Sequence, residues 1–554
     1  MMASSSKVEM IPLGGVGEFG MNMMLIRCDG EAIIVDAGMG FPEDEPGINI
    51  LIPDFSVIDK YRDEIAALFL THGHEDHIGA VPFLLKEIDL PIYGTRLTLA
   101  RVENKLVEHG LERTTVLHPI DEPETIRLKT FEVDFINVSH SLNCSTAIAI
   151  RTPVGVLLHS GDFKIDKTPV LGESIDLEAI AKYGDSGVLA LLSDSTNAEW
   201  PGFTPSERAV IPELRKQFEQ ATGRIILTCF TTSTHRIQIV LNLAEEFGRK
   251  VVLLGRSMIQ NIETISSLRL LDVPDDILVS TAEAKKLPDD RLVLLVAGSQ
   301  GEPRSAMTRI ATDQHKGISV GPGDLVIHSA RVIPGKERAI SRMISHCYRL
   351  GARVVDKSIA PVHVSGHASQ EELAIMIRTT KPKFLIPIHG EHRQLYRHKE
   401  FAETLGIVDS DRIILFENGD VLELDGISAR VVGKEVVGRT FIDNAGGEVE
   451  NMVVRDRRHL SYDGVVVCIV AINPTSGELD SEPEIVSRGF VDAEEGAEFM
   501  ADLKLVIEAA VKGASHEQRI DPAVMQEEIR IALKRSIKKR TGRQPMIVPV
   551  ILDV

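Results

Sequence analysis

A cluster of potential metal ligands constrains the fold of this chain more than any other sequence feature. Residues 72–77 read HGHEDH and directly follow an apolar, strand-like run. Ligand-type side chains at this density cannot share one face of a strand or a helix, so we expect a loop folded around a common centre. Gly73 tolerates the backbone angles that such a turn requires. The pattern predicts that two ion sites begin from two pairs: His72 with His74, and Asp76 with His77.

The loop alone cannot complete two coordination shells, so further ligands must come from the ends of other strands. Three strand-like runs end in a suitable side chain, namely His140 in VSHS, Asp162 in HSGDF and His389 in IPIHG. Asp36 closes the run AIIVD and is placed to fix the orientation of a ligand histidine. Each of these residues alone is more often a strand-end polar group or a structural histidine. Their occurrence together with the HGHEDH loop favours metal ligation.

The order of these motifs, from Asp36 through HGHEDH and His140 to Asp162, resembles the metallo-β-lactamase superfamily. The resemblance implies an α/β fold, an αββα sandwich of two facing sheets with two divalent metal ions at one edge. It implies that Asp162 bridges both ions and that the other ligands form two sets: His72, His74 and His140 on one ion, and Asp76, His77 and His389 on the other. Mixed imidazole and carboxylate ligation suits Zn²⁺, with Mn²⁺ as an alternative.

The length of 554 residues predicts about three domains rather than one. Metal-site motifs occupy both 1–209 and 360–440, so we expect one metallo-β-lactamase domain in two parts. Continuous apolar runs within 210–359 are typical of buried parallel strands and predict an inserted α/β domain. A Gly-rich, charged linker is expected at 441–455. The remaining residues, 456–554, predict a small α/β assembly domain with these elements: strands at 464–472 and 546–552, and helices at 493–511 and 522–540.

Motifs on both sides of the insertion resemble the β-CASP branch, whose members cut nucleic acids. They are Asp194 in LSDST, HVSGHA at 363–368, and His389. The strings GSQGEP, IPGKE and LIPIHGE resemble the ribonuclease J family in particular, with Lys336 where the pattern of that family has asparagine. The resemblance spans about residues 10–440. It implies 5′→3′ exonuclease action on single-stranded RNA with 5′-monophosphate ends, additional endonuclease cuts, and homodimers or homotetramers.

Within this resemblance, hydrolysis of a phosphodiester divides into separate tasks. Two ions roughly 3.5–4 Å apart would activate water and clamp the phosphate. His367 is predicted to protonate the leaving 3′-oxygen, with Asp194 to orient it and Asp76 to act with them. The alternative, non-catalytic roles are a structural histidine for His367 and a surface ion pair for Arg331. Candidates for contact with phosphate or the RNA backbone are His363, Ser365, Gly366, Ser329, Arg331, His235 and Arg236.

The net charge of −20 opposes general adhesion to RNA, but it says nothing of a single cleft that holds two divalent ions. Cations near the C-terminus either touch RNA or a partner, or form a solvated helix face: Lys534, Arg535, Lys538, Lys539, Arg540 and Arg543. Five scattered cysteines indicate neither a disulfide framework nor a zinc ribbon. With a polar N-terminus and no membrane-length apolar run, the sequence predicts a cytoplasmic protein without a membrane segment.

Other interpretations fit less of the sequence. GVGEFG at 15–20 matches a dinucleotide-binding pattern, but 21–27 and 32–36 predict strands joined by a hairpin at Asp29-Gly30, which leaves no helix where that site needs one. A small-molecule hydrolase would not need the insertion or His367. A DNA nuclease of the same branch stays an alternative, although the resemblance associates histidine at position 389 with RNA. A non-catalytic scaffold would tolerate lost ligands, and here every ligand position is filled.

Overall fold

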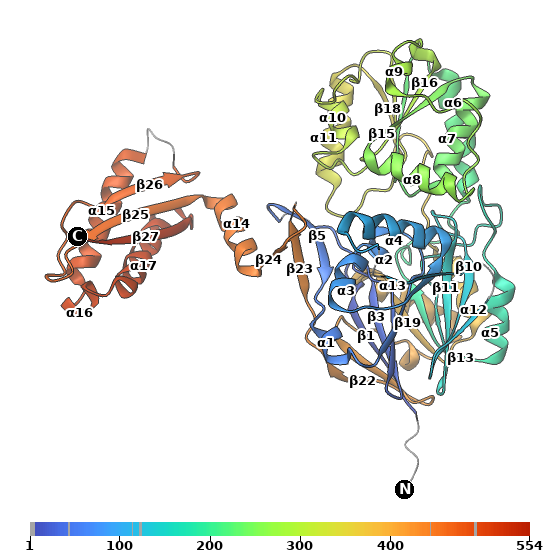
Figure 1. Ribbon diagram of the computed structural model, residues 1–554, viewed down its shortest axis with the longest axis horizontal. Coiled ribbons are helices and arrows are strands. Elements are labelled where there is room, and N and C mark those ends of the chain that lie inside the picture. The colour runs from blue at the N-terminus through green and yellow to red at the C-terminus, as the bar shows by residue number, and fades with distance from the viewer. Residues whose placement is uncertain (1–5, 43–44, 113–114, 121–123, 444, 492–495) are drawn as a thin grey trace, which may run out of the picture. The chain divides into compact units, whose positions relative to one another are not determined.

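The computed structural model describes residues 6–42, 45–112, 115–120, 124–443, 445–491 and 496–554 (Figure 1). The described residues divide into two compact units, residues 6–42 with 51–439, and residues 45–50 with 440–554. Among the described residues, no helix combines the length and the apolarity that a membrane crossing needs.

An eight-stranded sheet in the order β22-β21-β1-β3-β4-β6-β7-β8 forms one half of a sandwich in the first unit. Its strands are β1 (Val8–Gly14), β3 (Met23–Cys28), β4 (Glu31–Val35), β6 (Ile65–Phe69), β7 (Ile92–Thr95), β8 (Leu117–Ile120), β21 (Asp420–Leu424) and β22 (Ala429–Lys434). The predicted hairpin joins β3 to β4, and Asp29 and Gly30 have φ angles of 48° and 77°, as a type I′ turn requires. No helix follows GVGEFG, which excludes the dinucleotide interpretation.

A six-stranded sheet in the order β19-β13-β12-β11-β10-β9 forms the other half. Its strands are β9 (Thr125–Arg127), β10 (Glu132–Val138), β11 (Ser145–Thr152), β12 (Gly155–His159), β13 (Val188–Asp194) and β19 (Phe384–Ile388). β12, β13 and β19 run parallel, so their carboxyl ends lie at one edge. In the first sheet β4 and β6 are also parallel. Two short strands, β2 (Val16–Gly17) and β20 (Gly390–Glu391), pair with each other. In the sequence β2 follows β1 and β20 follows β19.

The facing sides of the two sheets form one apolar core. Val35 and Phe69 of the first sheet and Leu192 of the second belong to the same buried cluster. Helices cover both outer faces. They are α1 (Ser56–Tyr61), α3 (Val81–Glu87) and α4 (Arg96–His109) on the first sheet, and α5 (Leu177–Ser186), α12 (Gln370–Thr380) and α13 (His392–Leu405) on the second. The predicted αββα sandwich, and with it the α/β fold class, is confirmed.

Residues 211–355 form a separate sheet of five parallel strands in the order β15-β16-β14-β17-β18 (Figure 1). These are β14 (Ile225–Thr228), β15 (Lys250–Leu254), β16 (Leu292–Val296), β17 (Leu325–His328) and β18 (Arg353–Val355). Their apolar runs are continuous because helices cover both faces of the sheet. The helices are α6 (Ile211–Gln220), α7 (Thr234–Glu246) and α8 (Arg256–Ser267) on one face, and α9 (Thr281–Ala284), α10 (Ala306–Ala311) and α11 (Glu337–Arg349) on the other.

The second unit contains a three-stranded sheet in the order β26-β25-β27, packed on two long helices. Its elements are α14 (Asn451–Asp463), β25 (Val465–Ile472), β26 (Glu484–Arg488), α15 (Gly496–Gly513), α16 (His516–Arg519), α17 (Pro522–Thr541) and β27 (Met546–Asp553). Four of these lie where the sequence predicted strands and helices, although residues 493–495 of the predicted helix lie outside the described residues. Short elements elsewhere are α2 (Glu75–Ile78), β5 (Ile48–Pro53), η1 (Glu207–Val210), η2 (Asp289–Arg291) and η3 (Ser410–Arg412).

The segment 441–455, expected to be a linker, instead contains regular structure. β23 (Arg439–Asp443) pairs with β24 (Glu448–Val449), and α14 begins at Asn451. The Gly-rich residues form a turn between the two strands, because the Asp443 carboxylate accepts hydrogen bonds from the Ala445 and Gly447 amides at 2.8 and 3.0 Å. Asn444 lies outside the described residues. Glycine and charge therefore marked a hairpin here, not a free connector.

Candidate metal centre

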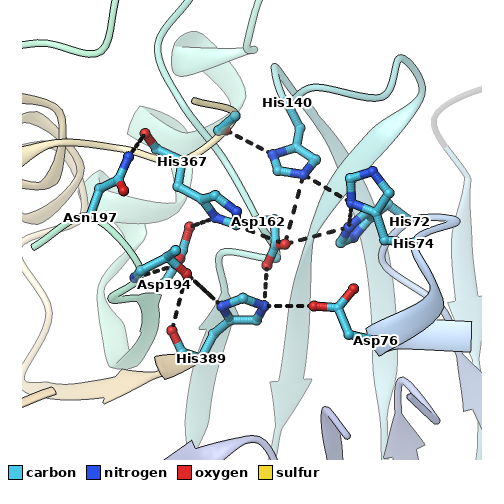
Figure 2. A network of polar contacts seen from close by, with 12 residues as sticks. His72, His74, Asp76, His140, Asp162, Asp194, Asn197, His367 and His389 are labelled. Carbon is cyan, nitrogen blue, oxygen red and sulfur yellow. Dashed lines mark hydrogen bonds and ion pairs between the residues drawn. The ribbon is translucent and has the colours of Figure 1, made fainter. Parts of the chain in front are cut away.

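The predicted ligands meet at the edge of the sandwich where the parallel strands end. HGHEDH follows β6, His140 follows β10, Asp162 follows β12 and His389 follows β19. Their ligand atoms form two groups, each with all atoms within 4.8 Å of one another. Asp162 belongs to both groups and lies among the labelled histidines in Figure 2. The groups are His72, His74, His140 and Asp162, and Asp76, His77, Asp162 and His389.

The orientation of these side chains fits a bound cation. His74 Nδ1 lies 2.9 Å from His72 Nε2 and 3.1 Å from His140 Nε2. Imidazole nitrogens that face one another so closely repel unless a proton or a cation lies between them. Asp162 Oδ1 and His389 Nε2 are buried and lie 3.3 Å apart, yet among the described residues neither makes a hydrogen bond of good geometry. Unsatisfied buried polar atoms are expensive, and a shared divalent ion would satisfy both.

Second hydrogen bonds fix which ring nitrogen of each histidine faces the centre. His77 Nδ1 donates to Asp36 Oδ2 at 2.7 Å, and Asp36 in turn accepts from the amide and the hydroxyl of Thr71, each at 2.8 Å. His140 Nδ1 donates to the Gly366 carbonyl at 2.8 Å. In both histidines Nε2 is therefore left for the centre, which is the arrangement that metal ligands need. Asp36 thus holds the ring of His77, and its support of a metal ligand stays a prediction.

Two threonines hold the remaining ligand rings. Thr71 Oγ1 lies 3.1 Å from His72 Nδ1, and Thr196 Oγ1 lies 2.7 Å from His389 Nδ1. His389 has a left-handed backbone with φ of 54°, a conformation that costs about 1–3 kcal/mol in most side chains. The Thr196 contact and the β2–β20 pairing hold the residue in that conformation.

Burial keeps the first group of histidines neutral. It lowers the pKa of His72 and of His74 well below the ordinary value, and neighbouring imidazoles lower both further. Burial also lowers the pKa of His140 to about 4, with His367 adding to the effect. These nitrogens are therefore free of protons at neutral pH and ready to bind a cation.

Carboxylates reverse this behaviour in the second group. Burial opposes the charged form of His77 and His389, but the charge of Asp162 and further carboxylates outweighs it. The pKa of His77 is raised well above the ordinary value, and that of His389 is raised to about 9. In the metal-free protein both rings carry an extra proton at neutral pH.

We expect a divalent cation to displace protons from His77 and His389 when it binds at pH 7, because a ligand nitrogen must be neutral. The pKa of His389 is raised to about 9 and that of His77 is raised well above its ordinary value, so at neutral pH these protons compete with the metal. As the pH is lowered, the apparent affinity of this group for the metal should fall about tenfold per pH unit for each proton displaced. Calorimetric titration with zinc in buffers of different ionisation enthalpy measures the number of protons released on binding. The variant His77→Ala should release fewer protons. Metal binding without proton release at pH 7 would contradict the expectation.

A histidine–aspartate pair lies beside the ligand groups. His367 Nδ1 donates to Asp194 Oδ2 at 2.8 Å, and Asp194 Oδ1 accepts from the Thr196 amide at 2.9 Å (Figure 2). Burial opposes the ionised form of Asp194, but His367 outweighs it and lowers the pKa of the carboxyl. The His367 side chain is 17% exposed whereas that of Asp194 is 1% exposed. His367 can therefore reach a bound substrate while Asp194 fixes its orientation.

The loop before His367 is held against the same edge by Asn197. Asn197 Nδ2 donates to Ser365 Oγ and to the His367 carbonyl, both at 2.9 Å, and Arg331 Nη1 donates to Asn197 Oδ1 at 2.9 Å. A Cβ atom on Gly366 would lie 2.7 Å from His140 Cε1, so glycine is required for this approach. Ser365, Gly366 and Arg331 thus lie beside the centre, and their contact with phosphate stays a prediction.

His363 lies in the same loop but has a different electrostatic setting. Burial, with the positive charge of Arg236 beside it, lowers the pKa of His363 to about 3. A neutral imidazole can donate one hydrogen bond to a phosphate oxygen, yet it adds no charge.

Three predicted RNA contacts need correction. Arg236 is 1% exposed, and its guanidinium donates to Glu207 at 2.9 Å, to the Val362 carbonyl at 2.6 Å and to Ser329. Ser329 Oγ also donates to the Val362 carbonyl, at 2.7 Å. His235 is buried and accepts a hydrogen bond from the Leu171 amide at 3.2 Å. All three are engaged in the interior, so they shape the loop that precedes His367 and do not face a polynucleotide.

Several residues of the centre have no sequence signal of their own. Thr71 and Thr196 adjoin predicted residues, so their position in the chain could have suggested them. Asn197 and the buried Lys164, which donates to the Ser365 carbonyl at 3.3 Å, could not be identified from the sequence. Asn22 is a further one, with Nδ2 3.2 Å from His77 Nε2, and only its place after GVGEFG hints at it.

Four protein-family models match the chain over successive segments. They are described as metallo-beta-lactamase superfamily (residues 16–227), ribonuclease J, beta-CASP domain (222–347), Zn-dependent metallo-hydrolase RNA specificity domain (351–410) and ribonuclease J C-terminal domain (452–554).

Individual proteins match over nearly the whole length. Ribonuclease J of Synechocystis sp. is 41% identical over 559 residues, which cover 98% of this chain and 86% of that protein. Ribonuclease J2 of Bacillus subtilis is 39% identical over 553 residues, which cover 100% and 99%. A solved structure of a protein of unknown function from Enterococcus faecalis matches at 16% identity with a TM-score of 0.50, covers 76% of this chain and 100% of that one, and shows a likeness of fold alone.

Proposed function

Because the chain belongs to the ribonuclease J family and is a metal-dependent ribonuclease, we propose that it uses two metal ions to degrade single-stranded RNA in the 5′→3′ direction. It prefers 5′-monophosphate ends and also makes endonucleolytic cuts. The ions are Zn²⁺, with Mn²⁺ as an alternative occupant. The observation that most supports this proposal is the pair of ligand groups that share Asp162, next to the partly exposed His367.

The chain's own residues divide the work of hydrolysis. His72, His74, His140 and Asp162 would hold one ion, and Asp76, His77, Asp162 and His389 would hold the other. When bound, the ions stabilise negative charge on the phosphate and make water more acidic. Imidazoles fixed by Asp36, Thr71, Thr196 and Gly366 keep the ligand atoms in place without rearrangement during the reaction.

His367 supplies the proton for the leaving 3′-oxygen. Its Nδ1 is committed to Asp194, so Nε2 is the atom that faces the substrate. Asp194 cannot turn away, because its oxygens and its amide are engaged by Thr196, His367 and Ser160. The ring is thus held with Nε2 free to pass a proton to the leaving oxygen.

Recognition of the 5′ end falls to the loop that contains His363, Ser365 and Gly366, together with Arg331. The loop offers backbone amides, a hydroxyl and a neutral imidazole, and Arg331 adds a fixed guanidinium. This donor set suits a terminal phosphate monoester better than a hydroxyl end, which lacks the acceptor oxygens.

We expect matched RNAs that differ only at the 5′ end to be degraded at different rates. The RNA with a 5′-monophosphate should release mononucleotides about tenfold or more faster than those with a 5′-triphosphate or a 5′-hydroxyl, because only it fills the donor set without excess charge. Product analysis by denaturing gel measures this, with His77→Ala as the inactive control. Equal rates for all three RNAs would remove end recognition while leaving the ribonuclease activity intact.

The C-terminal unit is proposed to serve assembly into homodimers or homotetramers. One face of the sheet β26-β25-β27 packs on α15 and α17, whereas Val486, Val548 and Leu552 on these strands are exposed. Apolar side chains on an open sheet face favour association. We place the domain boundaries at residues 209/210, 359/360 and 440/441, with this unit responsible for assembly in the cytoplasm.

The alternatives have less support. A small-molecule hydrolase would not need the RNA specificity segment matched at residues 351–410, which contains His363, His367 and His389. A DNA nuclease is not favoured, because the relatives found over the full length are ribonucleases by name.

A further inference from the structure

Helix α11 has an unusual charge distribution for a chain with a net charge of −20. On its inner face Met343 and Cys347 pack on the inserted sheet, and Ile340 is buried as well. Its outer face lines an open groove, formed by Glu337, Arg338, Ser341, Arg342, Ser345, His346 and Arg349. Glu337 is the single acid in this groove.

The arginines of the groove are exposed and uncompensated. Arg338, Arg342 and Arg349 are all exposed, and among the described residues none has a carboxylate partner. At spacings of four and seven they share one face of the helix and extend roughly 16 Å along its axis. Three guanidinium groups without carboxylate partners create a local positive potential on a chain whose net charge is negative.

The start of α11 is tied to the catalytic edge. Arg331, beside the centre, is followed by a loop that Gln300 fixes through the Arg331 carbonyl and the Ile333 amide, both at 2.9 Å. Lys336, just before the helix, donates to the Pro42 carbonyl at 3.1 Å. A short, restrained segment thus leads from a residue of the candidate centre to the arginine groove.

From this placement we infer that the outer face of α11 is a second RNA-contact surface, which binds the phosphate backbone of strands that extend beyond the catalytic edge. The inference depends on the proposed function only in taking RNA as the substrate. Arginine forks match phosphate oxygens in pairs, and exposed serines add neutral donors. A protein partner is less favoured, because the groove has no apolar anchor such as stable protein interfaces use.

The test compares a long and a short RNA with the full-length protein. In the triple variant Arg338→Gln, Arg342→Gln, Arg349→Gln, the KM for an RNA of about 30 nucleotides should rise about tenfold, and the slope of log affinity against log salt should weaken by about 2. For a 5′-phosphorylated dinucleotide, which is too short to occupy both the catalytic edge and α11, kcat and KM should not change. Arg→Lys changes at the same positions should retain most of the salt dependence.

A matched control removes the same charge elsewhere. Lys182→Gln, Lys285→Gln, Lys286→Gln alters exposed cations that do not line the groove, and it should leave long-RNA binding unchanged. An unchanged salt slope and KM in the α11 variant would overturn the inference. This is also the result expected if the groove binds an acidic protein instead of RNA. Equal losses on both RNAs would overturn it too. Wild-type protein inactive on both RNAs would instead refute the proposed ribonuclease function.

Discussion

Replacement of Asp162 by asparagine is expected to reduce RNA hydrolysis by at least about 10³-fold. Asp162 is the one residue common to both ligand groups. Its Oδ2 lies 3.5 Å from His72 Nε2 and 3.4 Å from His77 Nε2, and its Oδ1 lies 3.3 Å from His389 Nε2. Asparagine preserves the shape but removes the charge that two cations would share.

The control for this change is another buried aspartate. Asp324→Asn weakens the ion pair with Arg224, whose Nη2 lies 2.6 Å from Asp324 Oδ2 in the inserted domain, and it should lower stability with little effect on kcat. Initial rates on 5′-monophosphorylated RNA, together with thermal unfolding of both variants, separate the two effects. Full activity of Asp162→Asn would refute the role of Asp162 as a shared ligand.

Replacement of His367 by alanine should reduce kcat by about 10²–10⁴-fold with little change in KM, because the lost group acts on the leaving oxygen rather than on ground-state binding. Asp194→Asn should cause a smaller loss, since the imidazole stays in place without its ionised partner. Single-turnover rates with saturating enzyme measure the chemical step directly.

A substrate with sulfur at the bridging 3′ position tests the assignment further. A thiolate leaves without protonation, so the deficit of His367→Ala should largely disappear on this RNA, whereas that of Asp162→Asn should persist. A deficit of His367→Ala that is equal on both substrates would show that His367 has a structural role only.

The fold could be predicted because its main signals are local. Apolar runs that end in polar ligands are strand ends, and the Asp29-Gly30 turn fixes one hairpin. The prediction of a linker at 441–455 was wrong, because glycine and charged residues occur both in free linkers and in tight turns. Only the pairing of β23 with β24, which depends on tertiary context, distinguishes the two.

The centre could be predicted only where a residue type has few other uses. Histidine and aspartate at strand ends indicated seven ligands, which the structure brings into two groups, and their role as ligands stays a prediction. Arginine is ambiguous, because Arg331 lines the centre whereas Arg236 is buried on Glu207. Asn197 was missed, since an asparagine that links a loop to an arginine has no pattern before the fold brings them together.

Anomalous diffraction from crystals of the zinc- or manganese-loaded protein tests the central claim most directly. We predict two peaks about 3.5–4 Å apart, both bound to Asp162, with the first also on His72, His74 and His140 and the second also on Asp76, His77 and His389. A single peak, or peaks bound to other residues in an active protein, would contradict the account.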